Sequence, residues 1–337
     1  MNFDFTDDQH EIKRTARDLL TKRSTWEKVR AAAEGGRYDD ELWRELGELG
    51  WPGIAIAEEH GGQGMGVVEL VILLEELGYA CAATPFLGNA LAGLVIQAAG
   101  SPDQQAAWLP GLATGERRGA VGAPGLIPDG AGADVLVIVT GDGLRLVPGA
   151  DAGADSVDAI DPTRRHASVA ESVAQGGAPL PGDGDLATDL ARAAVAAELV
   201  GVAQRALEMS VAYVKDRKQF ETPVGAFPAV SHRCAQMLRD TEMARSATYN
   251  AAWAADAAPE RLAEAAGVAK AAASEAGREV TASAIQVHGG IGFTWEADVH
   301  WLYKRAQIDA ALLGGAGAHR GRLAHMAAAR LAGARAS

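Results

Sequence analysis

A glycine- and proline-rich segment, residues 119–185, divides the chain into three parts that must fold differently. It contains thirteen glycines and six prolines, and both residue types disfavour helices. The flanking residues 1–118 and 186–337 carry apolar side chains at helical spacing, and the second region is rich in alanine, the strongest helix former. We predict a mainly α protein with an N-terminal helical domain (1–118), a small β domain (119–185) and a C-terminal helical domain (186–337).

Two apolar runs in the middle segment predict a β-hairpin. Residues 135–139 and 144–147 are separated by the sequence Gly-Asp-Gly, which tolerates the positive φ of a tight turn. Residues 166–169 predict a further strand. The small β domain is therefore expected to contain at least one antiparallel pair.

The flanking parts carry signals for helices. Thr6 and Gln9 have the spacing of a capping box. Four long helical patterns joined by short segments predict an up-and-down four-helix bundle at the C-terminal end. These patterns span residues 186–215, 229–257, 259–287 and 314–334.

Charge and cysteine content exclude several classes of protein. The net charge of −13 disfavours nucleic-acid binding, because phosphate contacts need clustered Lys and Arg. Only two cysteines occur, which is unlike a secreted disulfide scaffold. The first ten residues are acidic, unlike a signal peptide, and no run reaches the roughly 20 apolar residues of a membrane span. We expect a cytoplasmic protein that binds neither membrane nor nucleic acid.

Common catalytic signatures are absent from the sequence. His10 lacks a second histidine four residues later, and His288 and His300 have no ligand partners at metal-binding spacing. Ser231 and His232 are adjacent on a predicted helix and point in different directions, so they do not form a nucleophile–base pair. We predict no metal site.

Residues 216–220, Asp-Arg-Lys-Gln-Phe, interrupt the helical pattern between two long helices. A guanidinium at such a corner could hold an anion such as a pyrophosphate, because it offers a rigid fork of donors. The segment could equally be a basic helix C-terminus that the helix dipole favours. The sequence leaves both interpretations open.

Residues 286–293, Gln-Val-His-Gly-Gly-Ile-Gly-Phe, carry three glycines near the end of a long helix. One glycine suffices to end a helix, and additional ones let the backbone approach a ligand. The alternative is a tight turn that packs Phe293 and Trp295 into a core. Both interpretations remain open at this point.

Together these segments resemble the acyl-CoA dehydrogenase family, flavoproteins that desaturate acyl-CoA thioesters between Cα and Cβ. Residues 217–220 resemble its Arg-Lys-x-Phe-Gly segment, and residues 286–292 its Gln-x-x-Gly-Gly-x-Gly segment. Residues 58–64 and 161–165 resemble two further family segments, so the likeness runs through nearly the whole chain in order. The resemblance implies an N-terminal helical domain, a β domain and a C-terminal four-helix bundle.

The resemblance also implies a cofactor site. In this family the two C-terminal motifs hold the diphosphate and adenosine part of an FAD that belongs to a neighbouring subunit. The positions of this sequence that match those motifs are Arg217, Gln219, Phe220, Gln286, Gly289 and Gly290.

The chain departs from the family at its catalytic base. The two positions at which members carry the catalytic glutamate correspond to Leu313 and Ala191, and neither side chain can accept a proton. Asp189 and Glu198 lie nearby in sequence and are the remaining alternatives, although helical geometry turns both away from the required direction. We therefore assign no catalytic residue.

Further departures concern the flavin pocket. The family's Thr-Glu-Pro-x-x-Gly-Ser-Asp segment, which cradles the flavin ring, corresponds to residues 121–125, Val-Gly-Ala-Pro-Gly, and the surrounding β domain is short. Glu221 stands where the family has Gly, and Pro228 where it has Gln. The sequence thus argues against an independent active site.

These features resemble the short subunit, lacking the catalytic Glu, of bacterial heterotetrameric acyl-CoA dehydrogenases that act on steroid side-chain CoA esters. The resemblance implies an α2β2 complex with a homologous subunit that carries the Glu and binds most of the acyl-CoA. It also implies an electron acceptor such as electron-transfer flavoprotein. The alternatives are an active homo-oligomeric flavoenzyme with an unmatched base, and a non-catalytic scaffold on the same fold.

Overall fold

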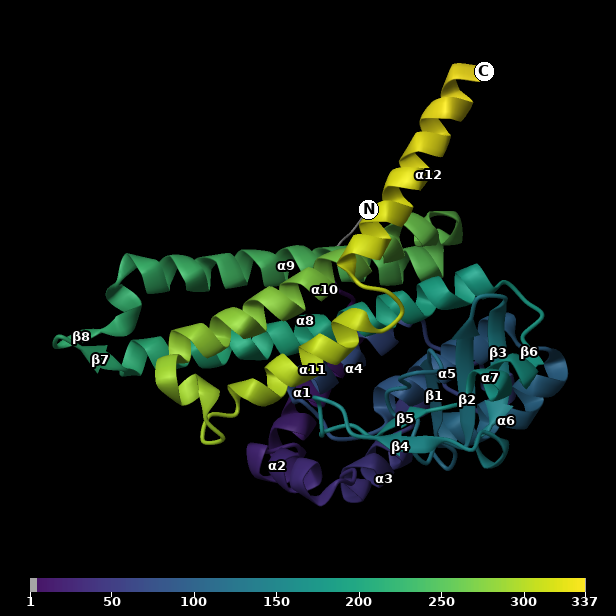
Figure 1. The fold of residues 1–337 in the computed structure, drawn as a ribbon, viewed down its shortest axis with the longest axis horizontal. Coiled ribbons are helices and arrows are strands. Elements are labelled where there is room, and N and C mark those ends of the chain that lie inside the picture. The colour runs from purple at the N-terminus through teal and green to yellow at the C-terminus, as the bar shows by residue number, and fades with distance from the viewer. Residues whose placement is uncertain (1–4, 337) are drawn as a thin grey trace.

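The computed structural model describes residues 5–336 and shows a mainly helical molecule with a small sheet at one end (Figure 1). The helices before the sheet are α1 (Asp7–Arg23), α2 (Trp26–Gly35), α3 (Asp40–Glu48), α4 (Val67–Tyr79), α5 (Phe86–Ala99) and α6 (Pro102–Thr114). The capping box predicted at Thr6 and Gln9 is confirmed at the start of α1. The predicted fold class, mainly α with a small β region, is confirmed.

The sheet follows these helices. Its strands β1 (Gly119–Gly122), β2 (Val135–Thr140), β3 (Gly143–Pro148) and β6 (Ala178–Pro179) pair in that order. The predicted hairpin is confirmed, since β2 and β3 are antiparallel with Thr140 opposite Gly143. The predicted strand at 166–169 is also present, as β5 (His166–Ser168), which pairs with β4 (Asp155–Val157); the short helix α7 (Glu171–Gly176) leads to β6.

Long helices form the rest of the molecule. They are α8 (Gly184–Asp216), α9 (Pro228–Ala257), α10 (Leu262–His288), α11 (Val299–Ala311) and α12 (Ala316–Ala336). A small hairpin, β7 (Lys218–Gln219) with β8 (Thr222–Pro223), joins α8 to α9 at the end of the molecule far from the sheet (Figure 1).

The fourth helix of the bundle is not the one predicted. Helix α11, which the sequence analysis missed, packs against α8 and α10. Helix α12 occupies the predicted segment 314–334, but it contacts α10 and then extends away from the body of the molecule (Figure 1). Helix α11 escaped detection because it buries His300, Arg305 and Asp309 among its apolar side chains, so its sequence shows no apolar face.

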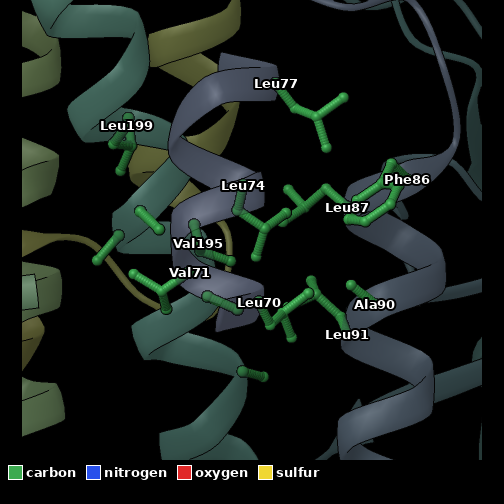
Figure 2. Packing of buried hydrophobic residues seen from close by; sticks show 14 of the residues in the cluster. Leu70, Val71, Leu74, Leu77, Phe86, Leu87, Ala90, Leu91, Val195 and Leu199 are labelled. Carbon is green, nitrogen blue, oxygen red and sulfur yellow. The ribbon is translucent and has the colours of Figure 1, made fainter. Parts of the chain in front are cut away.

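The N-terminal helices and the bundle share one hydrophobic core. Leu70 and Leu74 of α4 point toward Leu87 and Leu91 of α5, while the other side of α4 faces α8 (Figure 2). Because α4 and α5 are covered on more than one side, nearly all of their residues are buried. The sequence of α4 accordingly predicts a buried helix rather than an amphipathic one.

A buried ion network ties the sheet region to the bundle. Arg164, which precedes β5, bonds Asp129 (Nη1–Oδ2, 2.6 Å) and also Glu198 of α8. Arg305 of α11 bonds Asp161 (Nε–Oδ2, 2.7 Å) and shares the same Glu198 oxygen (Nη1–Oε1, 2.7 Å). All five side chains are buried, so these bonds form in a medium of low polarity, where losing one partner is costly.

Asp309 is a fourth carboxyl group beside the two arginines of this network. It is fully buried, its nearest cationic atom is Arg164 Nη2 at 3.8 Å, and neither of its oxygens has a hydrogen-bond partner among the described residues. Burial raises the pKa of Asp309 to about 8, an effect that the charge of Arg164 only partly offsets. Burial thus favours the neutral form of the Asp309 carboxyl group in the folded chain.

We expect Asp309→Asn to stabilise the chain increasingly as the pH rises from 5 to 8.5. The unfolded carboxyl ionises near pH 3.8, while the native one keeps its proton to about pH 8, so wild-type stability falls through this window. The amide has no such proton, and its Tm should gain roughly 5 °C on the wild type across the window in thermal unfolding scans. A variant less stable at every pH would show instead that Asp309 is ionised and stabilises Arg164.

Candidate functional site

An open cleft of about 600 Å³ lies at the end of the bundle far from the sheet, between the end of α8, the start of α9 and the end of α10. Four of the six predicted cofactor-binding residues line it, namely Arg217, Gln286, Gly289 and Gly290. The other lining residues are Tyr213, Val224, Ala229, Val230, Arg233, Val287, His288 and Ile291. The fold therefore brings together two motifs that lie about 70 residues apart in the chain.

The lining of this cleft is cationic. It contains Arg217 and Arg233 and no carboxylate, in a chain whose net charge is −13. Within residues 5–336, no carboxylate lies within 4.0 Å of either guanidinium. Two arginines without an ion-pair partner that line one cavity are suited to binding an anion.

Arg217 is positioned by the end of α8 and the hairpin. Its backbone N–H donates to the Tyr213 carbonyl (2.9 Å), and its own carbonyl accepts from the Val224 N–H (2.8 Å). The backbone is thus fixed on both sides, while the side chain remains exposed to solvent. Arg217 does stand at a helix C-terminus, and it also lines the cleft, so the two interpretations of this segment are compatible.

The glycines of the second motif form an exposed turn. Helix α10 ends at His288, and a 3-10 turn, η6 (Gly289–Phe293), follows. Gly289 has φ of +66°, and a Cβ atom added at Gly289 or Gly290 would meet no atom within 4 Å. The backbone therefore borders open space that a ligand can enter.

The interpretation of this segment as a core-packing turn is wrong. Phe293 is 77% exposed and Trp295 is 70% exposed, so neither side chain contributes to a core. Large aromatic side chains exposed together at one end of a protein are typical of a surface that another molecule covers.

His288 forms part of the cleft wall. Its ring stacks on Tyr213, with centroids 4.5 Å apart, and its Nδ1 lies 2.7 Å from the Ala284 carbonyl oxygen. Burial lowers the pKa of His288, so the ring is neutral at pH 7 and Nδ1 carries the proton it donates to that carbonyl. The stack gives the cleft a flat, uncharged side next to its cations.

The remaining two predicted residues lie outside this lining. Gln219 and Phe220 are on the β7–β8 hairpin, where Phe220 is 89% exposed. Phe220 and Glu221 both have positive φ, +53° and +64°, which only glycine adopts without cost. The strained turn holds the Phe220 ring away from its own chain.

Neither alternative base is available to a ligand. Glu198 is buried and bonded to Arg164 and Arg305, and Asp189 is buried and bonded to Arg192 (2.6 Å) and Arg322. Their charges are balanced by arginines and serve the fold.

The two positions aligned with the family's glutamate are apolar and closely held. Ala191 is buried within α8, and Leu313 lies in the loop after α11 with φ of +57°. Buried Lys270 donates to the carbonyls of Asp309 (3.0 Å) and Gly314 (3.2 Å), which fixes that loop. Burial also lowers the pKa of Lys270 to about 7.

Sequence reasoning missed Arg233 and Tyr213. Tyr213 lies four residues, about one helical turn, before Arg217. This spacing was the only sequence signal that could have placed Tyr213 next to Arg217. Arg233 lies beyond the matched motif, so nothing in the sequence linked it to Gln286. Within the described part of the chain, no cluster of His, Cys, Asp and Glu could hold a metal ion. No helix of residues 5–336 is long and apolar enough to cross a bilayer.

Comparison with protein families decides the relationship. Residues 6–116 match the acyl-CoA dehydrogenase N-terminal domain, and residues 186–328 match the acyl-CoA dehydrogenase C-terminal domain. The chain belongs to the acyl-CoA dehydrogenase family. Members of this oxidoreductase family use FAD, which agrees with a cleft that has two cations, an open glycine turn and a flat aromatic wall.

Individual members of the acyl-CoA dehydrogenase family align over most of the chain. Acyl-CoA dehydrogenase IpdE2 of Mycobacterium tuberculosis is 38% identical over 308 residues, 90% of this chain and 92% of that one. A variant of the Tcur3481–Tcur3483 steroid ACAD superposes with a TM-score of 0.85 at 31% identity, covering 97% of this chain and 99% of that one. The ChsE4–ChsE5 complex from Mycobacterium tuberculosis gives 0.84 at 26%, with the same coverage.

We expect Gly289→Ala and Gly290→Ala to differ in stability. Gly289 combines φ of +66° with ψ of −142°, a conformation closed to alanine, so Gly289→Ala should cost about 1–3 kcal/mol in the free energy of unfolding. Gly290 does not have positive φ and borders open space, so Gly290→Ala should change that free energy by less than about 0.5 kcal/mol. Urea unfolding of both variants measures the difference, and equal effects would contradict the conformation of the turn.

Proposed function

We propose that this chain is a subunit of an FAD-dependent acyl-CoA dehydrogenase, in which its cleft completes the FAD site of a homologous partner subunit. The chain would bind the diphosphate and adenosine part of the flavin and would lack a catalytic glutamate of its own. The observation that carries the proposal is the cleft itself, where Arg217 and the Gln286–Gly290 turn meet around a cavity without carboxylates.

The shape of the cleft supports binding between two subunits. It is open to solvent, and the exposed rings of Phe220, Phe293 and Trp295 come from the two segments beside it. A cofactor lying in such a cleft would be covered on one side only. A partner subunit that binds the rest of the flavin would cover both the cofactor and these rings.

The lack of a base supports a non-catalytic role for this chain within the complex. FAD supplies the hydride acceptor for desaturation, and a carboxylate must remove the α-proton of the acyl-CoA. Leu313 and Ala191 cannot do this, and Asp189 and Glu198 are buried in ion pairs. The glutamate would therefore come from the homologous subunit, which would also bind most of the acyl-CoA.

The similar proteins support a proposal for the substrate class. One similar solved structure is a variant of the Tcur3481–Tcur3483 steroid ACAD. Another is the ChsE4–ChsE5 complex. We propose that the substrate is a CoA thioester of a steroid side chain, that the complex is an α2β2 heterotetramer, and that electrons leave to an acceptor such as electron-transfer flavoprotein.

We expect Arg217→Ala to weaken FAD retention by at least 10-fold in the complex co-purified with the homologous subunit. The loss of a charge-assisted bond to a phosphate accounts for this magnitude. Lys218→Ala is the matched control, because Lys218 is the adjacent exposed cation and does not line the cleft. FAD per complex and its dissociation constant are measured by absorbance and fluorescence, with thermal unfolding as a check on the fold.

Three results would contradict the proposal. Unchanged FAD affinity in Arg217→Ala would show that the cleft does not hold the diphosphate. Stoichiometric FAD binding and acyl-CoA dehydrogenation by the chain purified alone would favour the homo-oligomeric enzyme. A co-purified complex without flavin would favour a scaffold.

A further inference from the structure

We infer that Arg233 is a second phosphate-binding residue of the cleft, acting with Arg217 on the diphosphate of the dinucleotide. The inference rests on the function proposed above and assigns a contact that the matched family motifs do not include. It follows from where Arg233 lies, from the absence of a neutralising carboxylate beside it, and from the chemistry of a diphosphate.

Arg233 and Arg217 reach the cleft from different elements. Arg217 follows the last residue of α8, and Arg233 lies in the second turn of α9. Both line the same cavity together with Gln286, Gly289 and Gly290 from the end of α10. An arginine therefore lines the cleft at the end of α8 and another at the start of α9, and the open glycine turn lines it at the end of α10.

Arg233 lines a second cleft as well, together with Asp240, Glu275 and Glu279, but within residues 5–336 no carboxylate forms an ion pair with its guanidinium. Helix α9 carries three arginines, and the other two are paired, Arg239 with Asp240 (2.7 Å) and Arg245 with Glu75 and Glu242. Within residues 5–336, the guanidinium of Arg233 has one hydrogen-bond partner, Ser283 Oγ at 3.4 Å. Ser283 lines the second cleft, so Arg233 lies between the two clefts, and its other N–H donors have no partner within residues 5–336.

A diphosphate needs more than one guanidinium. Each of its two phosphoryl groups presents oxygens that a planar guanidinium can bind through two parallel bonds, whereas one arginine can serve only one group in this way. Two unpaired guanidinium groups in one cavity match the two phosphoryl groups.

The test compares Arg233→Met with Arg239→Met, the matched control on the same helix that does not line the cleft. Methionine keeps the apolar stem and removes the charge. The dissociation constant of FAD is measured on the co-purified complex, and that of ADP on the purified full-length chain, at several salt concentrations. We expect Arg233→Met to weaken both by about 10- to 100-fold and to reduce the salt dependence, with no effect of Arg239→Met.

Arg233→Lys separates phosphate binding from a structural role. Lysine keeps the charge but not the fork, so it should restore the salt dependence and only part of the affinity. If Arg217→Ala weakens FAD binding and Arg233→Met does not, the inference is overturned and the proposed function stands. If neither substitution weakens binding, or the wild type binds neither probe, both fail. Equal losses in Arg233→Met and Arg239→Met would also overturn the inference.

Discussion

Helix α8 is the element on which the rest of the structure depends. It packs against α4, α5, α9, α10 and α11, so a single helix links the N-terminal helices to the bundle. Its contact with α4 is possible because each helix places a glycine at the crossing. A Cβ at Gly201 would lie 1.9 Å from the Glu75 carbonyl oxygen, and one at Gly78 would lie 2.2 Å from that of Glu198. Small residues are therefore required there, since backbone atoms cannot move aside.

The same helix carries Glu198 into the buried ion network and ends at Arg217 in the cleft. The sheet region is joined to the bundle through Arg164 and Arg305, which share one Glu198 oxygen. The two ends of α8 thus have different tasks. The end near the sheet is held by buried apolar and charged contacts, whereas the far end carries the exposed residues that face the cleft.

Charge is distributed unevenly over this acidic protein. The buried arginines Arg164 and Arg305 are paired with carboxylates, whereas within residues 5–336 the two arginines that line the cleft, Arg217 and Arg233, are not. An unpaired cation in a cleft without carboxylates is favoured when a ligand neutralises it. The proposed sharing of FAD with a homologous subunit gives a physical reason for this imbalance and for the exposed aromatic rings beside the cleft.

The sequence by itself determined the helical character of both flanking parts, the β2–β3 hairpin and the family. These depend on local patterns, namely capping residues, apolar periodicity, turn chemistry and motifs of consecutive residues. It also predicted Arg217, Gln286, Gly289 and Gly290 as cofactor-binding residues from such motifs, and the fold places these four around one cleft. Only the tertiary structure decided that α11 rather than α12 completes the bundle, since a helix with buried charges has no readable apolar face. Only the tertiary structure brought Arg233 to the cleft, because its partners there lie on other helices and no spacing along the chain encodes that approach.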